Sequence, residues 1–192
     1  TMKKIFATLV LALMVTFDAK AQDELSFERK QAIDSLALEK VRDLSKYIKI
    51  AGSKDTPFSE ANRVIDRAEE LFMNGAEIGV SSLHANTVQY YKVRKYFERL
   101  MRLNYDRVEI EWYNIEYVSD LQRQPDGTYV GVITIFQTFR GYDAEGNMVY
   151  KDTTKKDITV YVKRKETQIG GRTIGFWDVL LGDMRVKETT NR

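Results

Sequence analysis

The chain has 192 residues, with 30 Lys and Arg against 28 Asp and Glu, and it contains no cysteine. The absence of cysteine excludes disulfides, thiolate metal sites and a cysteine nucleophile. Since His84 is the single histidine, a transition-metal site is not expected either, and we predict no metal and no cofactor.

The first 21 residues have the pattern of a signal peptide. Lys3 and Lys4 precede the apolar stretch 5–17, and Ala19-Lys20-Ala21 matches an A-x-A cleavage site. The apolar stretch is shorter than the ~20 residues that a membrane-spanning helix needs. We therefore expect residues 1–21 to be removed and residues 22–192 to form a single domain. The predicted protein is exported, soluble in the periplasm or secreted, and has no transmembrane anchor after cleavage.

The charge balance of the remaining chain argues against nucleic acid as a partner. Residues 1–21 hold three lysines and one aspartate, so residues 22–192 carry equal numbers of basic and acidic side chains. The stretch 92–103 mixes Lys and Arg with Tyr and Phe, but helical spacing places the basic and aromatic side chains on separate faces. We therefore interpret its aromatic side chains as core and its basic side chains as solvated, and expect no nucleic-acid binding.

Helical periodicity dominates the first half of the chain. Apolar residues recur at i+3 and i+4 over 24–50, which predicts a long first helix. Thr56 is the expected N-cap of a second helix, with Pro57 at its first position, and Asn74-Gly75 is its expected end. A short hairpin and a third helix are predicted at 77–83, 88–91 and 92–103.

From Tyr105 onward the apolar period changes from 3.6 to 2, which indicates strands. Connectors rich in Gly, Asn, Asp and Pro separate four long segments, so neighbouring strands should form antiparallel hairpins. The expected strands are 106–120, 128–141, 147–164 and 172–187.

The first long strand contains a change of register. Its apolar residues alternate up to Trp112 and then resume one residue out of step from Tyr113. A one-residue slip turns every later side chain to the opposite face unless a β-bulge absorbs it. We therefore predict a bulge at Trp112-Tyr113, which would bend the strand and curl the sheet around a cavity.

This order of elements resembles the NTF2-like superfamily, which includes the SnoaL-like and ketosteroid-isomerase-like families. The segment 74–80 followed by 90–97 looks like that superfamily's hairpin running into its third helix, and the resemblance covers residues 30–187. It implies an α+β fold with N-terminal helices packed on a curved, bulged antiparallel sheet of four long strands plus a short hairpin. It also implies a cone-shaped pocket between the concave face and the helices, and self-association through the sheet.

Asp178 is the candidate catalytic residue. It lies in the apolar run 174–183, and residues two apart from it, including Phe176, are apolar. If this face points inward, desolvation would raise the pKa of the carboxyl and suit it to act as a general base. The alternative is structural, with Asp178 paired to a lysine or bonded to a neighbouring strand.

Other strand residues are candidates for a ligand-binding pocket. In the strand 147–164, Asp152 and Lys156 lie in the polar middle of a face with apolar ends, which would place them at a pocket mouth or on an ordinary surface. Gln137 lies on an apolar face, where it is either a structural amide or a ligand contact. The tyrosines with hydroxyl groups available to a ligand, unless they simply fill the core, are Tyr113, Tyr117 and Tyr150.

Three functions remain open. The leading hypothesis is a non-enzymatic exported module that binds a small apolar or amphipathic ligand, or a partner protein, on the concave sheet. The second is an isomerase, cyclase or hydratase of small molecules with Asp178 as general base. The third is a structural module that forms homodimers and has no pocket function.

Overall fold

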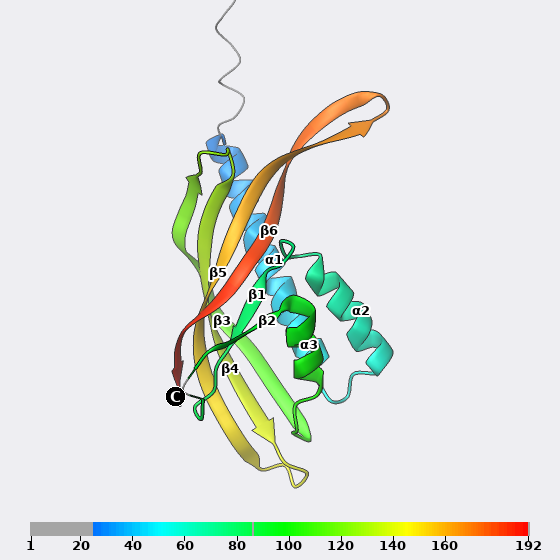
Figure 1. Cartoon of the computed structure of the whole chain (residues 1–192), viewed down its shortest axis with the longest axis vertical. Helices are drawn as coiled ribbons and strands as arrows, with labels where there is room; N and C mark the ends of the chain where they lie inside the picture. The colour runs from blue at the N-terminus through cyan, green and yellow to red at the C-terminus, as the bar shows by residue number, and fades with distance from the viewer. Residues whose placement is uncertain (1–24, 86, 192) are drawn as a thin grey trace, which may run out of the picture.

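The computed structural model describes residues 25–85 and 87–191, and Figure 1 shows three helices packed on one face of a curved six-stranded sheet. The predicted signal peptide and its cleavage site lie outside the described residues. Within the described ranges, no helix is long and apolar enough to cross a membrane. The fold class is the expected one, α+β with a curved antiparallel sheet.

Helix α1 (Phe27–Gly52) covers the sheet over much of its length (Figure 1). Ser26 caps it, because the Ser26 hydroxyl accepts a hydrogen bond from the Arg29 N–H at 3.3 Å. The apolar stripe that predicted this helix is its buried face. The buried residues of the stripe are Ile33, Ala37, Val41, Leu44 and Ile48.

Helix α2 (Phe58–Glu69) differs from the prediction at both ends. Pro57, and not Thr56, is its N-cap residue, and the helix ends before the predicted Asn74-Gly75. The following residues pair with the last strand instead, because the Met73 N–H donates to the Leu181 carbonyl at 2.7 Å. Hydrogen bonds to the sheet therefore replace the last turns of the predicted helix.

The strands form one sheet in the order β2-β1-β6-β5-β4-β3. Consecutive long strands are antiparallel, as their turn-forming connectors predicted, whereas β1 meets β6 in parallel at Ile78 and Met184. Helix α3 (Val93–Met101) follows the short hairpin and packs on α1 and α2. The strands are β1 (Glu77–Val80), β2 (Gln89–Lys92), β3 (Arg107–Arg123), β4 (Tyr129–Tyr142), β5 (Met148–Ile169) and β6 (Arg172–Thr190).

The predicted bulge in β3 is present, slightly later than expected. Tyr113 pairs with Phe136 and Glu116 pairs with Thr134, so β3 contains one extra residue in this interval. Asn114 has a φ of 50°, in the left-handed region that asparagine tolerates. The slip therefore begins after Tyr113, and Tyr113 stays on the outer face.

Strands β5 and β6 continue beyond the rest of the sheet as a two-stranded arm, residues 163–178, seen in orange at the upper right of Figure 1. The pairing of β4 with β5 ends at Val162, so beyond that point β5 and β6 pair with each other. Gly170 and Gly171 form the tip with φ values of 58° and 76°, which two-residue hairpin turns of type I′ require.

Candidate functional site

A cavity of about 260 Å³ lies between α3, the loop after β1 and the inner faces of β3, β4 and β5. This volume lies just below the about 300–1,000 Å³ of typical ligand pockets, so the cavity has room only for a small ligand. Its lining combines an apolar portion with a polar strip along β5. The apolar lining residues are Val80, Tyr96, Leu100, Leu103, Tyr105, Ile110 and Phe139.

The polar strip consists of alternate residues of β5. Tyr150, Asp152, Thr154 and Lys156 all line the cavity, because residues two apart in a strand point to the same face. From the sequence, this face of β5 could line a pocket or lie on the surface. In the structure it is the inner face. Asp152 and Lys156 are deeply buried, with exposed fractions of 4% and 2%.

Asp152 is a buried carboxyl group with a fixed neighbour. The Tyr150 hydroxyl donates a hydrogen bond to Asp152 Oδ2 at 2.6 Å and accepts one from the Leu83 N–H at 3.1 Å. Burial raises the pKa of Asp152, while the Tyr150 hydrogen bond and the Lys156 charge act in the opposite direction. Burial, with the bond to Asp152 contributing, also raises the pKa of Tyr150 to about 12. This pair can hold or move a proton at the cavity wall.

Lys156 is a buried amine for which the described residues provide no ion-pair partner. Among the described residues, no hydrogen bond or ion pair to its Nζ is found, and this atom lies 5.9 Å from the centre of the Tyr96 ring. Burial lowers the pKa of Lys156 to about 8, and the charge of Asp152 opposes this effect. Its ammonium group therefore faces the cavity with little compensation from the protein.

Gln137 adds a polar amide to the same wall. Its Oε1 accepts a hydrogen bond from Trp112 Nε1 at 3.0 Å, which orients the amide. Gln137 pairs with Thr154 across the strands, and the neighbouring pair is Ile135 with Lys156. Gln137 therefore lies in the same cavity wall as Lys156. It is a buried residue that also lines the cavity.

The order of helices, short hairpin, helix and long bent antiparallel strands, closed around a cavity, is the architecture that the sequence resemblance implied. The fold resembles that of the NTF2-like superfamily. No family model matches the chain, and no curated protein matches it.

Two solved structures are similar to the chain at the level of the fold. A scytalone dehydratase-like protein from Novosphingobium aromaticivorans DSM 12444 has a TM-score of 0.44 and 12% identity, covering 86% of this chain and 91% of that one. A type 2 hexachlorocyclohexane dehydrochlorinase, LinA, has a TM-score of 0.39 and 14% identity, covering 85% of this chain and 91% of that one.

The structure places Asp178 and Phe176 away from the cavity. Asp178 forms an ion pair with Lys165 at 2.5 Å on the arm, and Phe176 is largely exposed. The core-facing residues of this part of β6 are Val179 and Leu181. Both faces of the run are apolar in sequence, so its composition did not reveal which one points inward. The lysine-paired alternative describes the observed contact of Asp178.

Tyr113 and Tyr117 also lie outside the cavity lining. Tyr113 stacks on Phe136 on the outer face, with ring centres 5.6 Å apart, because the bulge follows it. Tyr117 packs against the core farther along β3, and burial and the nearby Asp34 charge raise the pKa of its hydroxyl. Of the pocket residues predicted from sequence, the structure brings together Gln137, Tyr150, Asp152 and Lys156.

Sequence reasoning missed the residues that other elements bring to the cavity. His84 has an exposed side chain, as expected for a loop, yet it lies at the cavity rim with its ring 5.9 Å from that of Tyr150. Arg99 projects from the exposed side of α3 and also lines the rim. No motif marks these positions, so only the packing of α3 and the β1 loop against the sheet identifies them.

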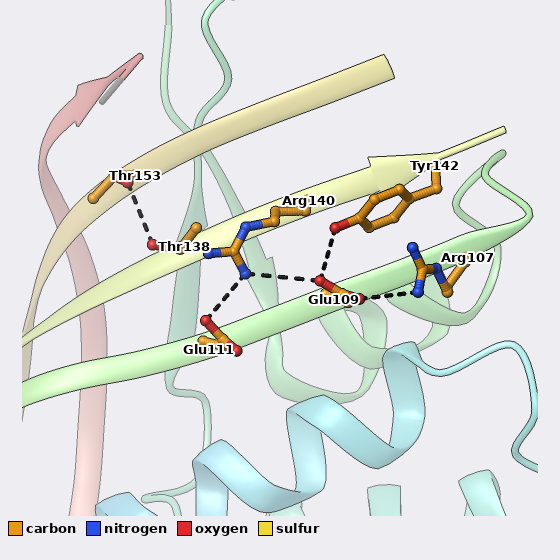
Figure 2. A network of polar contacts seen from close by, with 7 residues as sticks. All are labelled: Arg107, Glu109, Glu111, Thr138, Arg140, Tyr142 and Thr153. Atoms are coloured by element: carbon orange, nitrogen blue, oxygen red, sulfur yellow. Dashed lines mark hydrogen bonds and ion pairs between the residues drawn. The ribbon is translucent and has the colours of Figure 1, made fainter. Parts of the chain in front are cut away.

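The outer face of the sheet carries a separate charged network, shown in Figure 2 on the side away from α1. Glu109 accepts a hydrogen bond from the Tyr142 hydroxyl at 2.8 Å, and Arg140 bonds to Glu111 at 3.0 Å. Arg107 pairs with Glu109 at 3.3 Å. Arg140 and Tyr142 thus contact the two glutamates from β4, whereas Arg107 lies on β3 itself. Exposed ion pairs of this kind contribute little to stability.

Within the described part of the chain, no group of three or more His, Cys, Asp or Glu side chains is placed to hold a metal ion.

Proposed function

We propose that the protein is a small-molecule-binding module whose ligand occupies the cavity between α3 and the sheet. The observation that carries this proposal is the combination of an apolar cavity of about 260 Å³ with a buried polar strip along one wall. Ligand sites typically join an apolar lining to a few converging polar groups that fix orientation. A ligand with an apolar body and one polar end matches this division.

Native mass spectrometry of protein purified from its own host tests the proposal. The wild type should retain a small molecule that denaturation releases. Leu100→Phe should remove or reduce the extra mass, because the buried Leu100 lines the cavity and the larger side chain fills it. Leu36→Phe, at an exposed position on α1, should behave like the wild type. A clean unliganded mass over repeated wild-type preparations would count against the proposal.

A second candidate function is proton-transfer catalysis on a bound carbonyl compound. The supporting observation is the buried Asp152 carboxyl, which faces the cavity and has a pKa raised chiefly by burial. A carboxylate with a raised pKa suits removal of a proton next to a carbonyl group. In this version of the enzymatic hypothesis Asp152 takes the role of base that the sequence suggested for Asp178.

Exchange of C–H for C–D in D₂O, followed by NMR with small cyclic ketones, tests the catalytic candidate. The wild type should accelerate exchange next to the carbonyl, and Asp152→Asn should abolish the acceleration while the protein stays folded. Asp157→Asn provides a control on the same strand, since the Asp157 carboxylate accepts from Thr134 and lies outside the cavity lining. If no ketone exchanges faster with the wild type, the protein is a binder and not this enzyme.

We also propose that the module works outside the cytoplasm, on the strength of the signal pattern in residues 1–21. N-terminal sequencing of the protein isolated from its host should give a chain that begins at Gln22. Recovery of the full-length chain from the cytoplasm would reject export.

A further inference from the structure

The charged groups in the polar wall of the cavity are unequally compensated, and this indicates which class of ligand the cavity binds. Lys156 is 2% exposed and faces the cavity, yet the described residues offer its ammonium no ion-pair partner. Taking a charge out of water is costly unless it is paired and hydrogen-bonded. An anionic group on a ligand would supply the missing partner.

Asp152 does not provide the missing ion-pair partner of the Lys156 ammonium. It lies two inward positions from Lys156 along β5, beyond ion-pair distance, and the Tyr150 hydroxyl already bonds to it. Burial raises the pKa of Asp152, while the Tyr150 hydrogen bond and the Lys156 charge act in the opposite direction. The remaining cation of the lining, Arg99, lies at the exposed rim and adds positive charge. The charges of the cavity therefore favour an anion over a cation.

The neighbours of Lys156 supply further donors and an apolar path. Gln137 bonds to Trp112 through its Oε1, which leaves its N–H groups as donors in the same wall. Leu100, Ile110 and Phe139 line the apolar side of the cavity. A carboxylate accepts strongly from an ammonium and from amide N–H groups, and its apolar body can lie along these three side chains.

We propose that the cavity binds a small organic carboxylic acid in its anionic form, with the carboxylate held by Lys156 and Gln137 and the apolar body against Leu100, Ile110 and Phe139. This inference rests on the proposed binding function and specifies its ligand class. Lys156 acts as the charge partner of the ligand, and Gln137 as its orienting donor.

Two pairs of matched probes test the ligand class: phenylacetate with phenylacetamide, and hexanoate with hexanamide. Each amide reproduces the shape of its acid without the charge. Titration calorimetry on the protein without its signal peptide, residues 22–192, should show that each acid binds at least about tenfold more tightly than its amide. This difference corresponds to roughly 1.4 kcal/mol in binding free energy. Lys156→Met should weaken acid binding about tenfold and leave amide binding unchanged.

Lys155→Met is the matched control, because Lys155 is the next residue of β5 and its ammonium lies outside, 5.7 Å from the Phe136 ring centre. This variant should keep the wild-type preference for acids. If Lys156→Met does not fold, the ratio of acid affinity to amide affinity in the wild type tests the ligand class on its own.

The outcomes separate the inference from the function on which it rests. Equal binding of acids and amides to the wild type, or an acid preference that survives in Lys156→Met, overturns the carboxylic-acid inference and leaves the binding function standing. Failure of all four probes to bind the wild type overturns the inference, and the host-ligand experiment then decides the binding function separately.

Discussion

Lys155 and Lys156 are adjacent in the sequence and occupy opposite faces of β5. Strand geometry turns the Lys155 side chain toward Phe136 and water, and the Lys156 side chain into the cavity. Only Lys156 loses its hydration, so burial lowers its pKa to about 8 while Tyr96 and Asp152 face it from α3 and β5. Two identical residue types thus acquire different chemistry from one step along a strand.

The stability of the protein should depend on pH through Lys156. Burial lowers its pKa in the folded protein to about 8, from the ordinary lysine value of 10.5. Between these values the unfolded chain binds more protons, so the contribution of Lys156 to the free energy of unfolding rises with pH. From about pH 8 to 10.5, the wild type should gain up to roughly 3 kcal/mol relative to Lys156→Met. Burial keeps the facing Tyr96 neutral across this window, since it raises that pKa.

Urea unfolding of both proteins at a series of pH values measures this difference. At neutral pH Lys156→Met should be the more stable protein, since methionine does not desolvate a charge. Lys155→Met should follow the wild type at every pH. A difference between Lys156→Met and the wild type that stays constant from pH 7 to 10.5 would show that Lys156 does not titrate in this window.

At the scale of elements, the contact between β4 and the segment after α3 shapes the cavity. A Cβ atom at Gly141 would lie 2.5 Å from the Tyr105 ring, closer than atoms can approach. The Tyr105 ring also packs on Phe139 and lines the cavity. The missing side chain at Gly141 therefore creates the space that holds Tyr105 against the wall.

Gly141→Ala should displace Tyr105 and deform the cavity. We expect a loss of about 1–3 kcal/mol in the free energy of unfolding, as for overpacked cores, together with weaker ligand binding. Chemical denaturation and titration of the probe acids measure the two effects. Gly175→Ala is the control, because its Cβ would meet the flexible Arg164 guanidinium at 3.3 Å, and it should change stability by less than about 0.5 kcal/mol. Equal effects of the two substitutions would contradict this role of Gly141.

On the scale of the whole molecule, the arm extends beyond the part of the sheet that encloses the core. The cavity lies near the β4–β5 turn, and the arm extends from the opposite end of β5 (Figure 1). Ile169, Ile174 and Phe176 on the arm are all exposed. An isolated two-stranded hairpin has little stability of its own, so the arm should contribute little to global stability.

Deleting Thr167, Gln168, Thr173 and Ile174 removes two facing pairs of the arm and keeps its glycine turn. The free energy of unfolding should change by less than about 0.5 kcal/mol, because no core contact is lost. Leu44→Ala, in the fully buried stripe of α1, should cost about 2–5 kcal/mol in the same urea assay. A loss from the deletion as large as that from Leu44→Ala would mean that the arm stabilises the core.

The helices, the strands and part of the site could be predicted from local patterns along the chain. Periodicity identified the helices and strands, and the slip after Trp112 predicted the bulge, because both depend on local side-chain alternation. The same alternation grouped Asp152 with Lys156 on one face of β5. These features follow from neighbours along the chain, which a sequence records directly.

Which face of each strand points toward the core could be read only from the assembled tertiary structure. In β6, Leu181 pairs with Val160 and Met184 pairs with Ile158, so two residues of β6 lie opposite one residue of β5. This irregularity and the core-facing Val179 leave Asp178 outside the cavity. The packing of α3 and the β1 loop places Arg99 and His84 at the rim of the cavity that Asp152 and Lys156 line. Both faces of these strands carry apolar residues, so burial depends on which elements cover them, and that is a property of the assembled fold.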